Sequence, residues 1–334
     1  MSTTQYLTRD EVGILLTAAA HAPSMHNTQP WKFEIQGPVI DVLRDPERAL
    51  PVADPGGRMS RIGLGAAAFN LRVAAALLGH ETTLALEPDP ARPAVALRIF
   101  LAGRRVPVPG LSSLYGEITR RHTYRGPLLA VPMPPVLRHE LTVAAQAEEA
   151  ELDWLDGTRR TQLGRIIHDA DEREVHDEDR LHERMQWIGG RRDDDGVPAA
   201  ALGPLPQTPA SVRDLAAGFE VPDRGRASFE TKAAVAVLST PAEDSHGWLL
   251  AGMALQHLLL TATAHDLTAS FLNQALEYTD LRDQVRTLIG RRSWPQLILR
   301  CGYPADSAGH TPRRHWNDTL GTRVTPEGSE PWNK

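Results

Sequence analysis

A repeated pattern of small residues is the feature of the sequence that most constrains its fold. The stretch Gly65-x-Ala67-x-x-Asn70-Leu71-x-x-x-Ala75 aligns with Gly252-x-Ala254-x-x-His257-Leu258-x-x-x-Ala262, and every position is shifted by the same 187 residues (252 − 65). Two alanine-rich helices can share such residues by chance, but a predicted helix and strand also precede each copy. The sequence therefore predicts an α+β fold made of two tandem copies of one unit.

The first copy begins with a helix. Thr8 and Glu11 have the spacing of a capping box, and apolar residues follow at helical intervals, so this helix is expected at about 9–22. A buried helix is expected at 63–79, whereas residues 45–60, with three prolines and two glycines, are expected to form a loop. Apolar and alternating runs predict strands at 31–35, 39–43, 83–86 and 94–101.

The second copy contains long segments that the first lacks. Residues 168–186 are strongly acidic and residues 189–226 are rich in glycine and proline, so neither segment is expected to contribute to a core. We expect two halves, residues 1–110 and 111–334, with an insertion at about 168–230 in the second. Within the second half, helices are expected at 135–147 and 248–267, and strands at 151–155, 232–239 and 296–301.

The composition argues against several classes of function. A net charge of −6 at pH 7 argues against a nucleic-acid partner, which requires a basic surface. The first ten residues contain no apolar stretch of a signal peptide, and polar residues interrupt both long apolar stretches, so we expect a cytoplasmic protein without a membrane partner. The single cysteine, Cys301, excludes an intramolecular disulfide, and no His or Cys pair has the spacing of a metal site.

The loop after the first helix contains the strongest candidate for a binding site. A helix that stops at a proline leaves free backbone N–H groups beside small and amide side chains, which suits a flat ligand with polar edges, such as a flavin. A turn that merely follows the end of a helix is the alternative. The candidate residues are Pro23, Ser24, Met25, His26, Asn27 and Gln29.

The order of these residues resembles that of a known family. Pro-Ser-x-x-Asn-x-Gln-Pro-Trp, at residues 23–31, is similar to the flavin-binding loop of the nitroreductase superfamily, and with His26 and Thr28 in place it resembles the Acg-type subgroup. The resemblance implies antiparallel sheets flanked by helices. It also implies an FMN cofactor, which proteins of this superfamily bind across the interface of a homodimer.

In this chain the pieces of such a site are divided between the halves. The first half has the loop but no arginine-rich segment, whereas the second has an arginine-rich segment at 121–125 but no room for the loop before the strand at 151. Because each half lacks the segment that the other half retains, the two halves together can form one complete site. The resemblance therefore implies one FMN per chain, bound by a pseudo-dimer in which the two halves of one chain take the places of two subunits. The chain is expected to be a monomer or a homodimer of such pseudo-dimers.

The basic residues of the second half are candidates for binding the phosphate of FMN. The planar guanidinium of arginine forms paired, charge-assisted hydrogen bonds with phosphate oxygens. By resemblance, Arg121 and Thr123 contact the phosphate, and Arg125 contacts the N1/O2 edge of the flavin, where a cation stabilises the charge gained on reduction. The C-terminal basic pair resembles a second phosphate clamp, and a solvated surface pair is the alternative. These candidates are Arg121, His122, Thr123, Arg125, Arg313 and Arg314.

Two further segments resemble parts of flavin sites in this superfamily. The loop after the second buried helix is expected to place backbone N–H groups against flavin N5 and O4, through Ser270, Asn273 and Gln274, and a simple turn is the alternative. The glycine-containing segment 187–198 resembles a stretch that contributes to a lid over the flavin in Acg-type proteins. A disordered insertion is the alternative for this segment.

The resemblance implies an oxidoreductase that transfers hydride or electrons between flavin N5 and a small organic substrate. The flavin carries this chemistry, so no catalytic side chain is assigned. NAD(P)H remains an open choice of reductant, because no motif identifies it. The alternative is a protein that sequesters or stores FMN under a closed lid, with little turnover.

Overall fold

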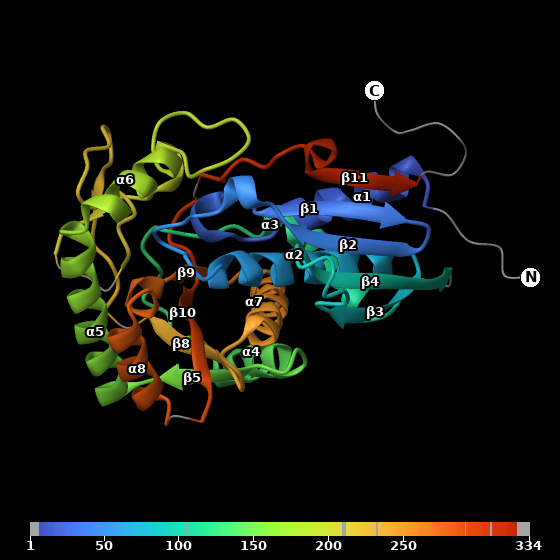
Figure 1. Cartoon of the computed structure of the whole chain (residues 1–334). Coiled ribbons are helices and arrows are strands. Elements are labelled where there is room, and N and C mark those ends of the chain that lie inside the picture. The colour runs from blue at the N-terminus through green and yellow to red at the C-terminus, as the bar shows by residue number, and fades with distance from the viewer. Residues whose placement is uncertain are drawn as a thin grey trace, which may run out of the picture.

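A computed structural model describes residues 7–104, 106–208, 212–231, 233–290, 292–307 and 309–325 (Figure 1). The helices are α1 (Arg9–Ala20), α2 (Arg58–Leu77), α3 (Tyr115–Arg120), α4 (Pro135–Gln146), α5 (Gly157–Val175), α6 (Glu178–Trp187), α7 (Ser245–Ala264) and α8 (Thr279–Leu288). The strands are β1 (Trp31–Gln36), β2 (Val39–Arg44), β3 (His80–Leu86), β4 (Val95–Arg104), β5 (Glu151–Leu155), β6 (Leu205–Pro206), β7 (Arg226–Ala227), β8 (Ala234–Thr240), β9 (Thr268–Phe271), β10 (Trp294–Gly302) and β11 (Leu320–Thr325).

Within the described residues, two principal sheets have the same internal strand order. In the first sheet the strands lie in the order β1, β2, β4, β3, and in the second they lie in the order β5, β8, β10, β9. All of these neighbouring pairs are antiparallel. In each unit a helix precedes the first strand, and a long helix, α2 or α7, connects the second strand with the third. The fold is therefore an α+β fold of two units with matching topology, as the repeat predicted.

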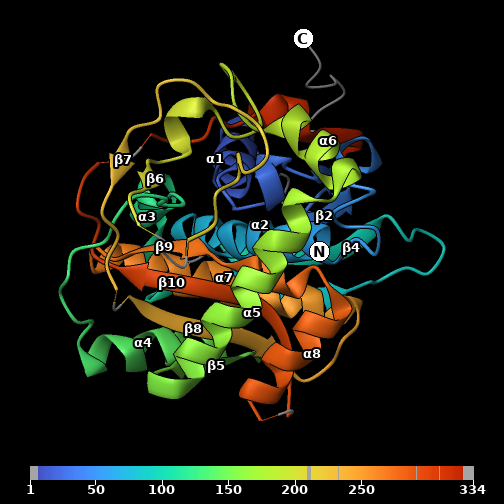
Figure 2. The same ribbon diagram turned by 90° about the vertical axis from the view of Figure 1, so that its left-hand side faces the viewer.

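The two long helices cross at the repeated glycines, near the centre of the molecule (Figure 2). A Cβ atom on Gly65 would lie 2.1 Å from the backbone oxygen of Leu249, and one on Gly252 would lie 2.0 Å from that of Ile62. The two contacts are equivalent, because the 187-residue shift relates position 65 to 252 and position 62 to 249. Only a residue without a side chain allows the backbones to approach so closely.

The long helices also contribute to each other's hydrophobic core. Leu249, Met253 and Leu260 of α7 are buried in the core of the first unit. Met59 and Ile62 of α2 are buried in the core of the second. Among the described helices, α7 is long and apolar enough to cross a membrane, but 67% of its most apolar stretch is buried inside the protein, as expected for a core helix. The shared cores make the two units one folded body.

Both long helices begin earlier than the sequence predicted. The residues 58–60, assigned to a loop, form the first turn of α2, because the Asp54 carboxylate accepts hydrogen bonds from the backbone N–H groups of Met59 and Ser60 at 2.9 and 2.8 Å. Similarly, Asp244 caps α7 by accepting a hydrogen bond from the N–H of Gly247 at 2.8 Å. Side-chain capping by aspartate extends a helix beyond its apolar stretch.

The prediction that residues 168–186 and 189–226 contribute no core is wrong. Ala170 of α5 is fully buried, and it packs with Leu163 and Ile166 of the same helix against the second sheet. The later segment has a small hydrophobic cluster of its own, formed by Ile188, Val197, Ala201, Leu202, Leu215 and Ala216. A few apolar residues in a polar segment are sufficient here because the segment packs on a body that is already folded. Residues 209–211 of the expected insertion lie outside the described residues.

The C-terminal strand returns to the first unit. β11 pairs with β1 in parallel, with Phe33 opposite Leu320, and thereby extends the first sheet at its edge (Figure 1). The expected boundary between residues 110 and 111 therefore separates the strands of the two sheets, with one exception: β11 follows this boundary in the sequence but belongs to the first sheet. The segment that leads to β11 passes the loop that follows α1, where it contributes to the candidate site.

Candidate functional site

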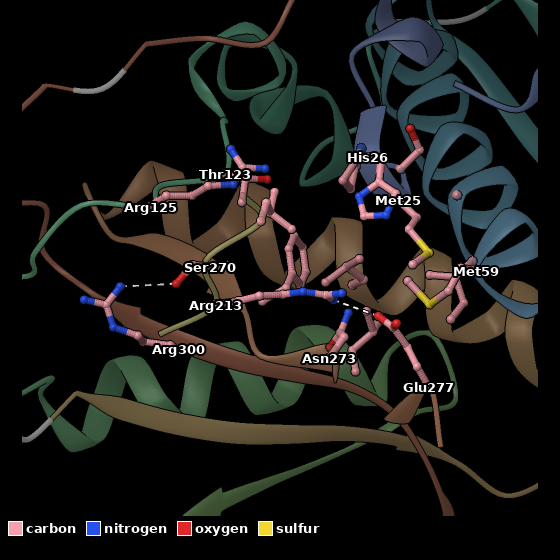
Figure 3. A pocket seen from close by; sticks show the side chains of 18 of the residues that line it. Met25, His26, Met59, Thr123, Arg125, Arg213, Ser270, Asn273, Glu277 and Arg300 are labelled. Carbon is pink, nitrogen blue, oxygen red and sulfur yellow. Dashed lines mark hydrogen bonds and ion pairs between the residues drawn. The ribbon is translucent and has the colours of Figure 1, made fainter. Parts of the chain in front are cut away.

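A pocket lies between the two units, beside the loop that follows α1 (Figure 3). It contains about 870 Å³ of empty space, its open mouth included. The expected site residues that line it are Pro23, Ser24, Met25, His26, Thr123, Arg125, Ser270 and Asn273. The loop, the arginine-rich segment and the residues after α7 therefore meet at one pocket, although they are far apart in the sequence.

Three residues of the loop at 23–29 have left-handed backbone conformations, which residues other than glycine rarely adopt. His26, Asn27 and Gln29 have φ angles of 51°, 57° and 52°, and the Ser24 hydroxyl accepts a hydrogen bond from the N–H of Gln29 at 2.9 Å. Such left-handed residues are costly unless their surroundings hold them. The loop turns back on itself, so that Ser24 and Met25 face the pocket while the amides of Asn27 and Gln29 point elsewhere.

Asn27 and Gln29 fasten the loop to later parts of the chain instead of lining the pocket. Asn27 Nδ2 donates to the carbonyl oxygens of Gly196 and Pro312, both at 2.9 Å, and its Oδ1 accepts from Arg313 at 3.0 Å. The Gln29 amide donates to the carbonyl of Asp194 at 2.8 Å, and it accepts from the N–H of Arg314 at 3.0 Å. The expectation that these two side chains contact a ligand has no support from this geometry.

His26 lines the pocket and stays neutral. Burial lowers its pKa to about 3, and the nearby positive charge of Arg213 contributes to the shift. A neutral imidazole at this position can donate or accept a hydrogen bond but adds no charge to the pocket at ordinary pH.

A cluster of arginines without acidic partners lies beside the pocket. Arg121 is only 5% exposed, and both Arg121 and Arg313 donate a hydrogen bond to the carbonyl of His21, at 3.2 and 3.5 Å. Burial lowers the pKa of Arg121 and of Arg125 to about 10 and that of Arg313 to about 9, and mutual repulsion adds to the shifts of Arg125 and Arg313. Within the described part of the chain, Arg121 Nε and Nη1 and Arg313 Nε have no hydrogen-bond partner.

His122 and Arg314 lie at the margin of this cluster. The His122 ring lies against that of His310, with centroids 4.4 Å apart, and its Nδ1 is 3.1 Å from the carbonyl oxygen of Arg120. Arg314 contacts the carbonyl of Gln29 at 3.4 Å and the carboxylate of Asp45 at 4.0 Å. Arg314 therefore holds the loop and the C-terminal segment together, whereas Arg313 belongs to the cationic cluster.

Of the predicted site residues that follow α7, two line the pocket and one points away from it. Asn273 lines the pocket while its Oδ1 accepts a hydrogen bond from the N–H of Ile298 at 2.8 Å. Ser270 also lines the pocket, and its hydroxyl accepts from Arg300 at 3.2 Å (Figure 3). Gln274 is turned away, because its Nε2 donates to the carboxylate of Asp171 on α5 at 2.9 Å.

Asp171 should make the stability of the protein depend on pH. Burial raises its pKa to about 6, so the folded state disfavours the carboxylate and loses stability as the pH rises from about 4 to 6. We expect Asp171→Asn to raise the Tm by roughly 2–4 °C more at pH 7 than at pH 4. Thermal unfolding across this range checks the result, with Asp169→Asn, an exposed position on the same helix, as the control. Equal effects of the two substitutions at pH 7 would contradict it.

The pocket also has lining residues that the sequence did not indicate. Arg213 enters it from the segment after α6, and its guanidinium pairs with Glu277 at 2.7 Å (Figure 3) and with Glu174 at 2.9 Å. These partners are 64 and 39 residues away in the sequence, so no local pattern relates them. The other unexpected lining residues are Met59, Ile62, Gly63, Val212, Leu215, Leu255, Phe271, Glu277, Leu297 and Arg300. Most are apolar residues of helices and strands that periodicity identifies only as core.

The arrangement suits a flat ligand with an anionic group. Apolar side chains of α2 and α7, such as Ile62 and Leu255, line the pocket together with the polar Thr123, Ser270 and Asn273. The cationic cluster beside it offers unpartnered N–H donors, which bind an anion more strongly in a buried site than in water.

Comparison with known proteins gives relatives along nearly the whole chain. Two Mycobacterium tuberculosis proteins carry the name Putative NAD(P)H nitroreductase. One is 31% identical over 323 residues, which cover 95% of this chain and 93% of that protein. The other, with the added designation acg, is 26% identical over 326 residues, which cover 95% and 97%. No protein-family model matches the chain.

The solved structures that match the chain include two nitroreductases. The FMN-dependent nitroreductase NfnB of Mycobacterium smegmatis, in complex with NADPH, is 19% identical with a TM-score of 0.36, and the match covers 67% of this chain and all of that one. A nitroreductase of Bacteroides fragilis with bound FMN is 13% identical with a TM-score of 0.38, and the match covers 59% and 91%.

Proposed function

This chain belongs to the NAD(P)H nitroreductase family, and on that basis we propose that it is an FMN-dependent oxidoreductase that reduces a small organic acceptor with NAD(P)H. The observation that carries the proposal is the buried cationic cluster of Arg121, Arg125 and Arg313, which has no acidic partner among the described residues. Buried cations are normally paired, so an unpaired group of three requires an anion that is part of the working protein.

The phosphate of FMN fits this requirement. It carries about two negative charges, and its oxygens accept the paired hydrogen bonds that guanidinium groups donate. Arg121 and Arg313 would hold it, because both retain an unpartnered buried nitrogen beside the carbonyl of His21. Arg125 lines the pocket itself and would face the ring system.

The pocket provides both apolar and polar contacts for an isoalloxazine ring. Met25, Ile62 and Leu255 offer apolar surface, while Ser270 and Asn273 stand at positions where backbone and side-chain groups can meet the polar edge of the ring. When bound, FMN supplies the hydride and electron transfer. The positive charge of Arg125 would favour the reduced, more negative form of the cofactor, which is electrostatic stabilisation where charge develops.

We propose that the site is single and is formed by a pseudo-dimer. The matching strand orders and the reciprocal contacts at Gly65 and Gly252 support two copies of one unit within the chain. The loop at 23–29 comes from the first copy and the arginines from the second, so each copy contributes a different part of the pocket.

We also propose that the insertion at 168–230 acts as a lid. Val212, Arg213 and Leu215 close one side of the pocket, and the bridge from Arg213 to Glu174 and Glu277 holds them there. An acceptor that must reach the flavin would displace these side chains. The comparisons name reductases and give no support to the alternative of a storage protein.

The proposal predicts a yellow protein with one FMN per chain. The flavin absorbance and protein concentration of the purified chain give this ratio, after reconstitution with FMN if needed. In anaerobic stopped-flow mixing, NADH or NADPH should bleach the flavin band, and a nitroaromatic acceptor should restore it. A chain that cannot bind FMN, or that binds two, would contradict the composite site. A bound flavin that NAD(P)H does not reduce over minutes would contradict the enzymatic function alone.

A further inference from the structure

A second cavity lies next to the flavin pocket, between α5 and the segment before β8. It contains about 1050 Å³ of empty space, its open mouth included. Val212 and Arg300 line both cavities, so the two share a wall. None of the family's expected flavin-binding residues lines the second cavity.

The shared wall is a fixed structure. Arg300 is 3% exposed, and its guanidinium pairs with the Glu230 carboxylate at 2.6 Å while donating to the Ser270 hydroxyl at 3.2 Å (Figure 3). Glu230 also accepts a hydrogen bond from the N–H of Leu128 at 2.9 Å. The one acidic residue among the described lining residues is therefore neutralised by its partners, and it adds no net negative charge to the cavity.

The remaining charge in the cavity is positive. Arg160 on α5 lines it and donates one hydrogen bond, to the carbonyl of Ala233 at 3.3 Å. In the part of the chain that the structure describes, no carboxylate forms an ion pair with Arg160. The hydroxyls of Thr161, Thr208 and Thr231 line the same cavity and can donate hydrogen bonds to an anion.

Apolar side chains also line the cavity. Leu163 and Leu272 are 1% exposed, and Phe229, whose ring lies 5.5 Å from the Arg300 guanidinium, is 8% exposed. Among the described lining residues, a ligand in the cavity therefore meets apolar side chains and one cation without an ion-pair partner. This combination matches a small amphipathic carboxylate.

We propose that this side cavity binds a small carboxylic acid with an apolar body. The carboxylate pairs with Arg160 and the threonine hydroxyls, and the apolar body lies on Leu163, Leu272 and Phe229. The proposal goes beyond the flavin chemistry and does not depend on it. Through Val212 and Arg300, a ligand in the side cavity touches the wall of the flavin pocket, so its binding should be sensed there.

The test compares octanoate with its neutral analogue octanamide, by calorimetric titration of the purified full-length protein with and without FMN. The wild type should bind octanoate at least tenfold more tightly than octanamide, because a charge-assisted hydrogen bond is lost with the neutral compound. Arg160→Gln should remove this preference, and Arg160→Lys should keep most of it. Arg165→Gln, an exposed position on the same helix, is the matched control and should retain the preference.

A second set of measurements locates the ligand. Thr161→Trp, at the exposed rim of the cavity, should weaken both compounds, and octanoate should change the flavin absorbance of the loaded protein without releasing FMN. The proposal is overturned if wild type does not bind octanoate, if Arg160→Gln and Arg165→Gln behave alike, or if octanoate displaces FMN. FMN binding is scored separately by absorbance, so failure of the flavin proposal would not be mistaken for failure of this one.

Discussion

Arg121→Ala is expected to lower the affinity for FMN at least tenfold and to raise the Tm of the FMN-free protein. The loss of affinity follows from the removal of a charge-assisted contact to phosphate, worth about 1.5–3 kcal/mol. The gain in stability follows because Arg121 is buried with unpartnered nitrogens beside two other cations, so the empty site is strained by repulsion and desolvation. Replacing an arginine with a purely structural role would not lower the affinity for FMN while raising the Tm of the FMN-free protein.

The measurements are FMN titration by fluorescence quenching and thermal unfolding with and without FMN. Arg120→Ala is the matched control, because the adjacent Arg120 is exposed and pairs with Glu117 at 2.6 Å and Asp266 at 2.8 Å. It should leave FMN affinity unchanged. If Arg121→Ala retains full affinity, the phosphate lies elsewhere. If the variant loses both affinity and apo-protein stability, Arg121 serves the fold and the loss of binding is indirect.

Gly65→Ala and Gly252→Ala are each expected to lower the free energy of unfolding by about 3 kcal/mol. The new methyl group would overlap a backbone oxygen of the opposite helix, which cannot move aside as a side chain can. Because the two contacts are equivalent and lie at one crossing, the effects should be similar in size. The double variant should cost less than their sum, since the first methyl already separates the helices.

Urea-induced unfolding of the full chain measures these changes. Gly13→Ala is the control, because a Cβ atom at this position in α1 would lie 3.7 Å from the Trp316 ring, an ordinary contact. It should be neutral or stabilise the protein by about 0.5–1 kcal/mol, since alanine is the better helix former. A small effect of Gly65→Ala would show that the helices do not approach as closely as described.

The sequence predicted most of the two sheets because their strands are apolar and their repeat is regular. Residues 151–155 form β5 at the predicted bounds, and the other expected strands differ by a few residues at their ends. The predicted start of α2 was late because Asp54 caps it from outside the apolar stretch. The core contributions of residues 168–226 could not be predicted, since they depend on contacts with segments far away in the sequence.

The sequence predicted which segments lie near the pocket. It did not predict which side chains of those segments point into the pocket. Of the predicted site residues, Met25, His26 and Ser270 line the pocket, but Asn27 and Gln29, in the same motif, fasten the loop to the segments around Gly196 and Arg314. A motif states which residue types occur together, not which way each one points. The φ angles that turn these amides away arise from the folded surroundings and leave no pattern in the sequence.

The return of the C-terminal segment to the first unit has a consequence for biosynthesis. During translation, β1 emerges from the ribosome before the second unit, whereas the strand that covers its edge, and Arg313 of the cationic cluster, emerge after that unit. A partly synthesised polypeptide would thus present an open sheet edge and an incomplete anion site. Nascent chains would be prone to association until β11 has paired with β1, and the cationic cluster would be complete only once Arg313 has joined it.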